Sequence, residues 1–263
     1  MKIHLPGFLL PRPSLRFIHI WRRNRLVWTK LAIPSMLGNL ADPMLYMLGL
    51  GYGLGAMLPH VVGMPYIAFL AAGTVCSSTM MSASFESMYS SFSRMHVQHT
   101  WDAILNAPVM LDDVVAGEAV WAASKAFLSG AAVLIVATAL GLVASPLALW
   151  VLPVVFITGL AFAGLGLIMT SLSPSYDFFM YYFTLAITPM MLASGVFFPL
   201  SQLPAWLQAA AQALPLTHAV ALVRPLMTGS VPQSAGVHVL VLVSYALASC
   251  YVALALARRR LLK

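Results

Sequence analysis

Acidic residues are scarce in this 263-residue sequence, and four of the seven lie within the nineteen-residue stretch TWDAILNAPVMLDDVVAGE. They are Asp102, Asp112, Asp113 and Glu118. Clustered carboxylates can bind a divalent metal ion. Here, however, Asp102 is ten residues before Asp112, and the adjacent Asp112 and Asp113 would point to different faces of a helix. The spacing therefore disfavours a metal site.

A further acid, Glu86, lies inside an apolar run, in the serine-rich stretch SSTMMSASFESMYSSFSRM. An ionisable group within a membrane span indicates function, because facing it into lipid is costly. Ser77, Ser84 and Ser91 recur at seven-residue intervals along the same stretch. Such a face either forms hydrogen bonds across a helix interface or lines a polar route. Glu86 favours a cavity or a subunit interface at this face.

The sequence carries no pattern for catalysis. No G-x-x-x-x-G-K-[ST] loop occurs, and the glycines of GLGYGLG at 49–55 predict close helix packing instead of a phosphate site. His96 and His99 have the spacing of two metal ligands but no neighbouring third one. No G-x-S-x-G elbow is present either. We therefore expect a protein that is not an enzyme and that has no cofactor of its own.

Composition places these residues in a membrane. Apolar residues make up 61% of the chain and charged residues only 8%, against about 25% charged residues in soluble domains. A helical span needs about 20 apolar residues, and six such runs are predicted, at 36–57, 66–91, 119–143, 148–172, 178–198 and 236–257. The net charge of +7 comes from basic residues gathered at the two ends of the chain, which indicates cytoplasmic termini and not a nucleic-acid partner.

Residues 1–33 are predicted to be a cytoplasmic N-terminus with an interfacial helix, and 34–263 the six-span domain. Ser14 can cap a helix from Leu15 to about Ala32. Its apolar face would lie in lipid and its cationic face would meet anionic headgroups. The alternative is a solvated helix packed on a partner. The two faces comprise Phe17, Ile20, Trp21, Val27, Trp28 and Leu31 on the apolar side, and Arg16, His19, Arg23 and Lys30 on the cationic side.

Residues 199–235 are predicted to be external, yet they are too apolar for an ordinary loop. The sequences LPAWLQAAAQAL and LTHAVALVRPLM each have about half the length of a span and are separated by Pro215. This pattern favours a re-entrant hairpin of two short helices dipping into the outer leaflet, with its turn shielded by protein. An external cap is the alternative.

The acidic stretch lies in the only sizeable cytoplasmic link, 94–118. An apolar edge beside Asp102 is formed by Trp101, Ile104, Leu105 and Pro108, and the acids that follow NAPV favour the positive end of a helix dipole. An exposed tryptophan and leucines flanked by carboxylates predict a docking surface for another protein. A solvated linker is the alternative.

Three segments carry a resemblance to a known family. TWDAILNAPVMLDDVVAGEAVWAASKA and LADPMLYMLGLGYGLG resemble the permeases of type-2 ABC exporters, specifically the lipo-oligosaccharide class of nodulation-factor (NodJ-type) permeases. FFPLSQLPAWLQAAAQALPLTHAVALVRPL resembles the signature before the final span of the wider family. The resemblance implies an all-α integral membrane protein of the bacterial inner membrane. Its expected parts are six transmembrane helices, an N-terminal amphipathic interface helix, a cytoplasmic coupling helix and an external re-entrant helical hairpin before the last span.

The resemblance also implies partners. Permeases of this family work as pairs with two copies of a separate P-loop ATPase, here a NodI-like subunit that would bind the ATP and Mg. The first cytoplasmic link would insert a coupling helix into a groove of that ATPase, and the hairpin would gate the outer end. The implied coupling residues are Trp101, Asp102, Leu105, Pro108, Leu111 and Asp112, and the implied outer gate comprises Pro204, Pro215, His218 and Arg224.

The implied function is export of a lipo-oligosaccharide or another lipid-linked saccharide. Aromatic side chains suit sugar faces and acyl chains alike, although stacked core aromatics are the alternative. An exporter of a drug or other amphiphile, and an ATPase-independent secondary transporter, are the rival functions. The candidates for the translocation path are Glu86, Tyr89, Tyr181, Tyr182, Phe197 and Phe198.

Overall fold

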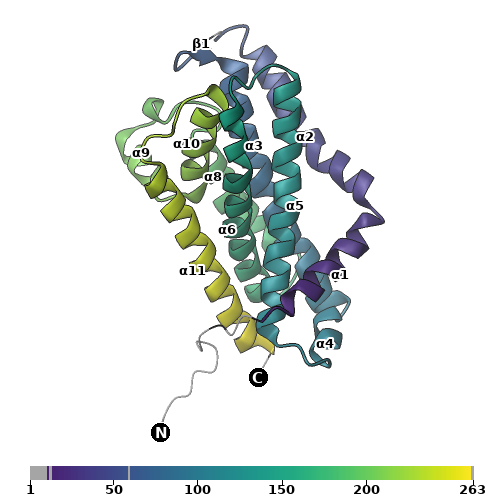
Figure 1. Cartoon of the computed structure of the whole chain (residues 1–263). Helices are drawn as coiled ribbons and strands as arrows, with labels where there is room; N and C mark the ends of the chain where they lie inside the picture. Colours follow the sequence, from purple (N-terminus) through teal and green to yellow (C-terminus); the bar gives the residue numbers. More distant parts are fainter. Residues whose placement is uncertain (1–10, 12–13, 59, 262–263) are drawn as a thin grey trace.

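The long apolar runs form helices that pack side by side, because a helix satisfies its own backbone hydrogen bonds without water. A computed structural model describes residue 11 and residues 14–58 and 60–261. Four helices in this part of the chain are long and apolar enough to cross a membrane (Figure 1). They are Tyr66–Val97, made of α3 (Tyr66–Phe85) with the widened turns η2 (Glu86–Ser90) and η3 (Ser93–Val97); α5 (Leu111–Ala139); α6 (Val151–Leu172), which continues from η4 (Pro146–Trp150); and α11 (Ala235–Leu261).

The count of six spans is not confirmed. The predicted span 36–57 corresponds to α2 (Ala32–Gly53), which is not among the four candidate spans. The polar residues Asn39 and Asp42 lower its mean hydropathy, and Pro43 lies inside the helix. The predicted span 178–198 corresponds to a shorter apolar helix of 17 residues. That helix comprises α7 (Asp177–Tyr182), η5 (Phe183–Ile187) and α8 (Thr188–Ala193).

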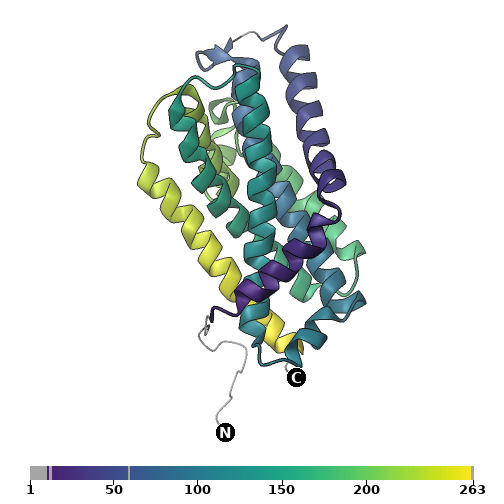
Figure 2. The same ribbon diagram turned by 45° about the vertical axis from the view of Figure 1, so that its right-hand side comes forward.

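The predicted interfacial helix forms as α1 (Phe17–Thr29) and crosses α5 obliquely near one end of the bundle (Figure 2). Ile20 packs where Gly117 leaves room, and the indole N–H of Trp21 donates to Ser124 Oγ at 3.0 Å. Part of the apolar face expected to lie in lipid therefore packs on the protein. Apolar residues of α1 and its start that remain exposed are Leu15, Ile18, Leu26 and Val27.

The opposite end of the bundle carries short elements. β1 (His60–Val61) and β2 (Met64–Pro65) form a hairpin whose two turn residues, Val62 and Gly63, both have positive φ, as a tight hairpin turn requires. After η6 (Leu200–Gln202), the two predicted short helices are present as α9 (Ala205–Ala211) and α10 (Pro215–Thr228). Pro215 is the first residue of α10, a position at which proline needs no hydrogen-bond donor.

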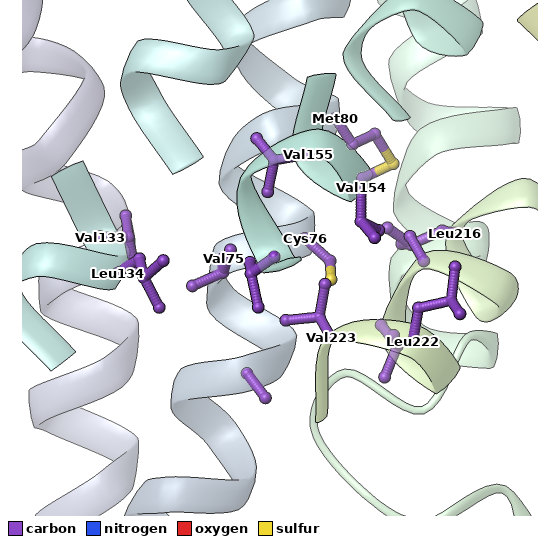
Figure 3. Close-up of a cluster of buried hydrophobic side chains, with 14 of the residues drawn as sticks. Val75, Cys76, Met80, Val133, Leu134, Val154, Val155, Leu216, Leu222 and Val223 are labelled. Carbon is purple, nitrogen blue, oxygen red and sulfur yellow. The ribbon is translucent and has the colours of Figure 1, made fainter. Parts of the chain in front are cut away.

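The helix α10 belongs to the core of the bundle. Its residues Leu216, Leu222 and Val223 lie in one buried cluster with Val75 of α3 and Val154 of α6 (Figure 3). A helix that only capped the surface would expose such side chains. The helix α10 therefore packs against α3 and α6 as part of the bundle, and the re-entrant placement of 199–235 stays a prediction.

A close approach of α6 and α11 at Gly164 predicts an effect on stability. A Cβ atom at Gly164 would meet the side chain of Ser249 and lie 2.9 Å from the backbone nitrogen of Cys250. We expect Gly164→Ala to lower the free energy of unfolding by about 1–3 kcal/mol, the usual cost of overpacking. Thermal unfolding in detergent measures the effect. Gly49→Ala is the matched control, because nothing lies within 4 Å of its Cβ position; equal melting temperatures for the two variants would contradict the expectation.

Candidate functional site

A buried network of opposite charges joins η2 and η3, the end of the long helix Tyr66–Val97, to α5. The carboxylate of Glu86 lies 3.0 Å from Arg94 Nη2 and 2.9 Å from Lys125 Nζ, and Arg94 Nε donates to Glu118 Oε1 at 2.9 Å. Glu86 is 5% exposed and Glu118 only 1%. Buried charges are tolerated when they are paired and hydrogen-bonded. Two acids and two bases balance each other here, and we call these four residues the ion network.

Neutral donors complete the ion network. Glu86 accepts hydrogen bonds from Trp121 Nε1 at 2.8 Å and from Ser90 Oγ at 2.9 Å. Glu118 accepts from Ser91 Oγ at 2.9 Å and from Trp101 Nε1 at 3.3 Å. Ser90 and Ser91 lie in and beside the widened turn η2, a helix irregularity often found at functional sites. The network thus links the end of the long helix Tyr66–Val97, α5 and the short helix α4 (Thr100–Leu105), which carries Trp101.

The prediction that Trp101 is exposed is wrong. Trp101 is 1% exposed, because its large apolar ring packs into the core and its N–H finds a partner in Glu118. Leu111 is buried as well, and Leu105 is half-buried. Pro108 is exposed, and the Asp102 side chain is 57% exposed. The predicted coupling residues therefore divide into an exposed edge and a buried anchor.

The four clustered carboxylates have separate structural roles. Glu118 belongs to the ion network, and Asp112 accepts from Arg258 Nε at 3.0 Å. Asp113 Oδ2 accepts from Met110 N at 3.1 Å and so caps the start of α5, as the dipole argument expects. Asp102 is the exposed member of the four, and among the described residues its ion-pair partner is the exposed His99 at 3.0 Å. Asp102 is therefore the acid of this cluster that places a negative charge on the surface of α4.

A pocket of about 160 Å³ lies between α2 and α3 and is rich in hydroxyl groups. Ser78 Oγ lies 2.7 Å from Ser129 Oγ of α5, whereas the buried Ser82 Oγ has no partner in the described part of the chain. The serine face of α3 thus serves both a helix interface and a pocket lining. We call this pocket the hydroxyl pocket; its polar lining includes Asn39, Asp42, Thr74, Ser77, Ser78 and Ser82.

The aromatic candidates are spread over the length of the bundle. Phe197 lines the hydroxyl pocket, and Phe198 lines a larger pocket of about 490 Å³ near β1. Tyr89 stacks in an aromatic cluster with Phe85 and Phe183, and Tyr182 packs edge-on against Phe183. The sixth candidate, Glu86, lies in the ion network and not in the hydroxyl pocket, and Tyr181 is 65% exposed.

Two of the four predicted outer-gate residues, His218 and Arg224, fix α10 to its neighbours. Arg224 Nη2 donates to the carbonyl oxygen of Gly195 at 2.6 Å, and its guanidinium lies 3.6 Å from the ring centre of Phe69. Burial lowers the pKa of Arg224 to about 10, which leaves the group charged at neutral pH. His218 Nδ1 lies 2.7 Å from Nδ1 of His238 on α11. Pro204 precedes α9, so the four residues lie on one helical hairpin and its edge.

Sequence reasoning missed most partners in these sites. It singled out Glu86 and Glu118 but not the pairing through Arg94 and Lys125, since the paired residues are 24 and 39 positions apart. It also did not select Asn39, which lines the hydroxyl pocket from α2. The sequence did contain an indication of the pairing with Arg94 and Lys125. A buried acid needs a counter-charge, and Arg94 follows the second apolar run while Lys125 lies within the third.

Comparisons with known proteins agree with this arrangement. Residues 15–228 match the family described as ABC-2 type transporter. The chain is 47% identical over 253 residues to nodulation protein J of Rhizobium meliloti strain 1021, covering 96% of this chain and 97% of that protein. It is 48% identical over 254 residues to nodulation protein J of Rhizobium leguminosarum bv. trifolii, covering 97% of each. The identity to nodulation protein J of Bradyrhizobium diazoefficiens is 46% over 255 residues, again covering 97% of each.

Proposed function

Since the chain belongs to the ABC-2 type transporter family, we propose that it is the permease subunit of an ATP-driven exporter of a lipo-oligosaccharide or another lipid-linked saccharide. Permeases of this family depend on a separate ATPase, and this sequence has no phosphate loop of its own. The name nodulation protein J, which its relatives carry, supports the choice of cargo class. The proposed location is the bacterial inner membrane, with α4 and both termini in the cytoplasm.

The observation that carries the proposal is the way in which α4 is attached to the helix bundle through Trp101. Its outer edge, with Asp102, is free to meet a partner, while Trp101 on its inner side bonds to Glu118 of the ion network. Arg94 continues the chain of contacts to Glu86 of η2. A displacement of α4 by an ATPase would therefore be transmitted through these contacts to the helices Tyr66–Val97 and α5, as a coupling helix requires.

The interface helix supports the same mechanism. The guanidinium of Arg16, at the start of α1, donates to the carbonyl oxygen of Pro108 in the link between α4 and α5. Movement of α4 would therefore carry the end of α1 with it. We propose that α1 and α4 move together when the ATPase changes conformation, with α1 lying along the inner membrane surface.

The hydroxyl pocket supports a saccharide cargo. Its serine and threonine hydroxyls, together with Asn39 and Asp42, offer donors and acceptors of the kind that sugar hydroxyl groups bind. The aromatic ring of Phe197 at the same pocket offers an apolar face. A purely apolar drug would leave these polar groups without partners, at a cost in binding free energy. The pocket would form part of the path in a pair of permeases, with the hairpin of α9 and α10 as the outer gate.

The exposed edge of α4 can be tested by recovery of the ATPase. We expect the double variant Asp102→Arg, Ala103→Arg to lose a P-loop ATPase that co-purifies with the wild-type protein from its native membrane, because both altered side chains are exposed and place new positive charge at the proposed contact. Mass spectrometry of the co-purified proteins is the measurement. The matched control is Asp177→Arg, which reverses an exposed acid in the next predicted cytoplasmic link.

The outcomes separate the rival functions. Retention of the ATPase by the double variant, or equal loss from the Asp177→Arg control, would contradict the role of α4. Absence of any ATPase from intact wild-type protein would favour a secondary transporter. Recovery of the ATPase together with export of an amphiphile that has no saccharide part would favour the drug-exporter alternative.

A further inference from the structure

A second polar pocket lies where α1 meets α3 and α5, apart from the hydroxyl pocket. Its volume is about 260 Å³. Arg23 and Asn24 line it from α1, and Arg94, Lys125 and the carboxylate-bearing Glu86 line it from the ion network. Trp28 of α1 and Trp121 of α5 also line it, with ring centres 5.9 Å apart in an edge-to-face arrangement. We call it the α1 pocket.

The α1 pocket has an excess of positive charge. Arg94 and Lys125 are matched by Glu86 and Glu118, so the charge of Arg23 is left over. Within the described residues Arg23 has no carboxylate in salt-bridge distance; it donates only to Asn24 Oδ1, at 3.0 Å. Burial lowers the pKa of Arg23, the nearby positive charge of Arg94 acts in the same direction, and Glu118 opposes them. An anion in the pocket would offset this leftover charge.

A buried donor in the same pocket also lacks a partner. Asn24 is 3% exposed, and its Nδ2 group has no hydrogen-bond acceptor among the described residues. Buried amide groups are nearly always hydrogen-bonded, and an unsatisfied one costs about 1–3 kcal/mol. The amide and the guanidinium of Arg23 are adjacent on α1. Together they match a ligand that presents several anionic oxygens.

The surroundings of the α1 pocket are apolar. Val27 and Leu31 line it and are 53% and 64% exposed, and Leu26 beside them is 51% exposed. An amphiphile could place a charged headgroup on Arg23 and Asn24 and its acyl chains along Val27 and Leu31. From this combination we infer that the α1 pocket binds the phosphate headgroup of an anionic phospholipid of the leaflet in which α1 lies. The inference does not depend on the identity of the exported cargo.

Quenching of tryptophan fluorescence tests the inference, because Trp28 and Trp121 line the pocket. The full-length protein is placed in phosphatidylcholine nanodiscs in which phosphatidylglycerol with brominated acyl chains replaces a rising fraction of the lipid. For the wild type we expect half-maximal quenching at a low fraction of the anionic lipid. Arg23→Gln is expected to raise that fraction about tenfold, as loss of one charge-assisted contact would. Asn24→Leu should raise it by a smaller factor.

Arg22→Gln is the matched control, since it removes the same charge from an exposed position on the same helix. It should leave the quenching curve unchanged. Equal shifts for Arg22→Gln and Arg23→Gln, or no preference of the wild type for the anionic lipid, would overturn the inference. If inorganic phosphate displaced the brominated lipid at millimolar concentration, the pocket would be a site for free phosphate, and the lipid assignment would be wrong. Gel filtration of each variant establishes that it is folded.

Discussion

Arg94→Gln is expected to destabilise the protein by about 3–5 kcal/mol, the cost of removing one partner from a buried ion pair. Arg94 contacts both Glu86 and Glu118, and both carboxylates are buried, at 5% and 1% exposed. Lys125 and Trp121 would still bind Glu86, whereas Glu118 would lose its positively charged partner. Most of the destabilisation would therefore come from the unpaired carboxylate of Glu118. Thermal unfolding of the detergent-solubilised protein should show a decrease in melting temperature on the order of 10 °C.

The double variant Arg94→Gln, Glu118→Gln provides the decisive comparison. With both charges removed, no uncompensated carboxylate remains at Glu118, and we expect much of the lost stability to return. Asp102→Asn is the control for loss of an exposed ion pair, worth less than about 1 kcal/mol. If Arg94→Gln unfolded at the same temperature as Asp102→Asn, the ion network would not hold α3 and α5 together.

Trp101→Ala is expected to reduce export about tenfold or more while the ATPase still binds. Truncating a buried tryptophan costs about 3–5 kcal/mol, and at this position the loss falls on the attachment of α4 to the bundle. The exposed edge around Asp102 would stay available to the ATPase, but its motion would no longer reach α3 and α5. Export and ATP hydrolysis, measured side by side in reconstituted vesicles, should then respond differently, with export falling further.

Trp101→Phe is the matched variant for this experiment. Phenylalanine keeps most of the apolar contact and removes only the N–H that donates to Glu118 at 3.3 Å. We therefore expect its export to lie between that of the wild type and that of Trp101→Ala. Unchanged export by a folded Trp101→Ala protein would mean that α4 does not act through its anchor in the bundle.

The sequence was sufficient for those features that depend on local composition. Apolar runs located the four long helices, because a helix in lipid needs about 20 such residues. The paired short helices and Pro215 at the start of α10 followed from their length and from the proline. The cap at Asp113 followed from the preference of acids for the start of a helix. Each of these depends on residues within a few positions of one another.

Other features depend on contacts between distant segments, and the sequence did not reveal them. The amphipathic pattern of Trp101 and its neighbours predicted an apolar edge, but which side faces the bundle depends on Glu118, 17 residues away. The same holds for α1, where Gly117 of α5 decides that Ile20 packs on protein. The α1 pocket requires residues from four helices, α1, α2, Tyr66–Val97 and α5, so no single pattern could indicate it.

The arrangement of the ion network also bears on how the protein enters its membrane during synthesis. The helix Tyr66–Val97 is made before α5, at a time when Glu118 and Lys125 are still absent. Because Arg94 reaches back to Glu86 within this one helix, the segment carries its own counter-charge from the outset. Insertion of an isolated carboxylate at the centre of a helix costs about 2.5–3.5 kcal/mol, and the internal pair reduces that cost. The later arrival of α5 then adds Lys125 and Glu118 as a second pair of opposite charges.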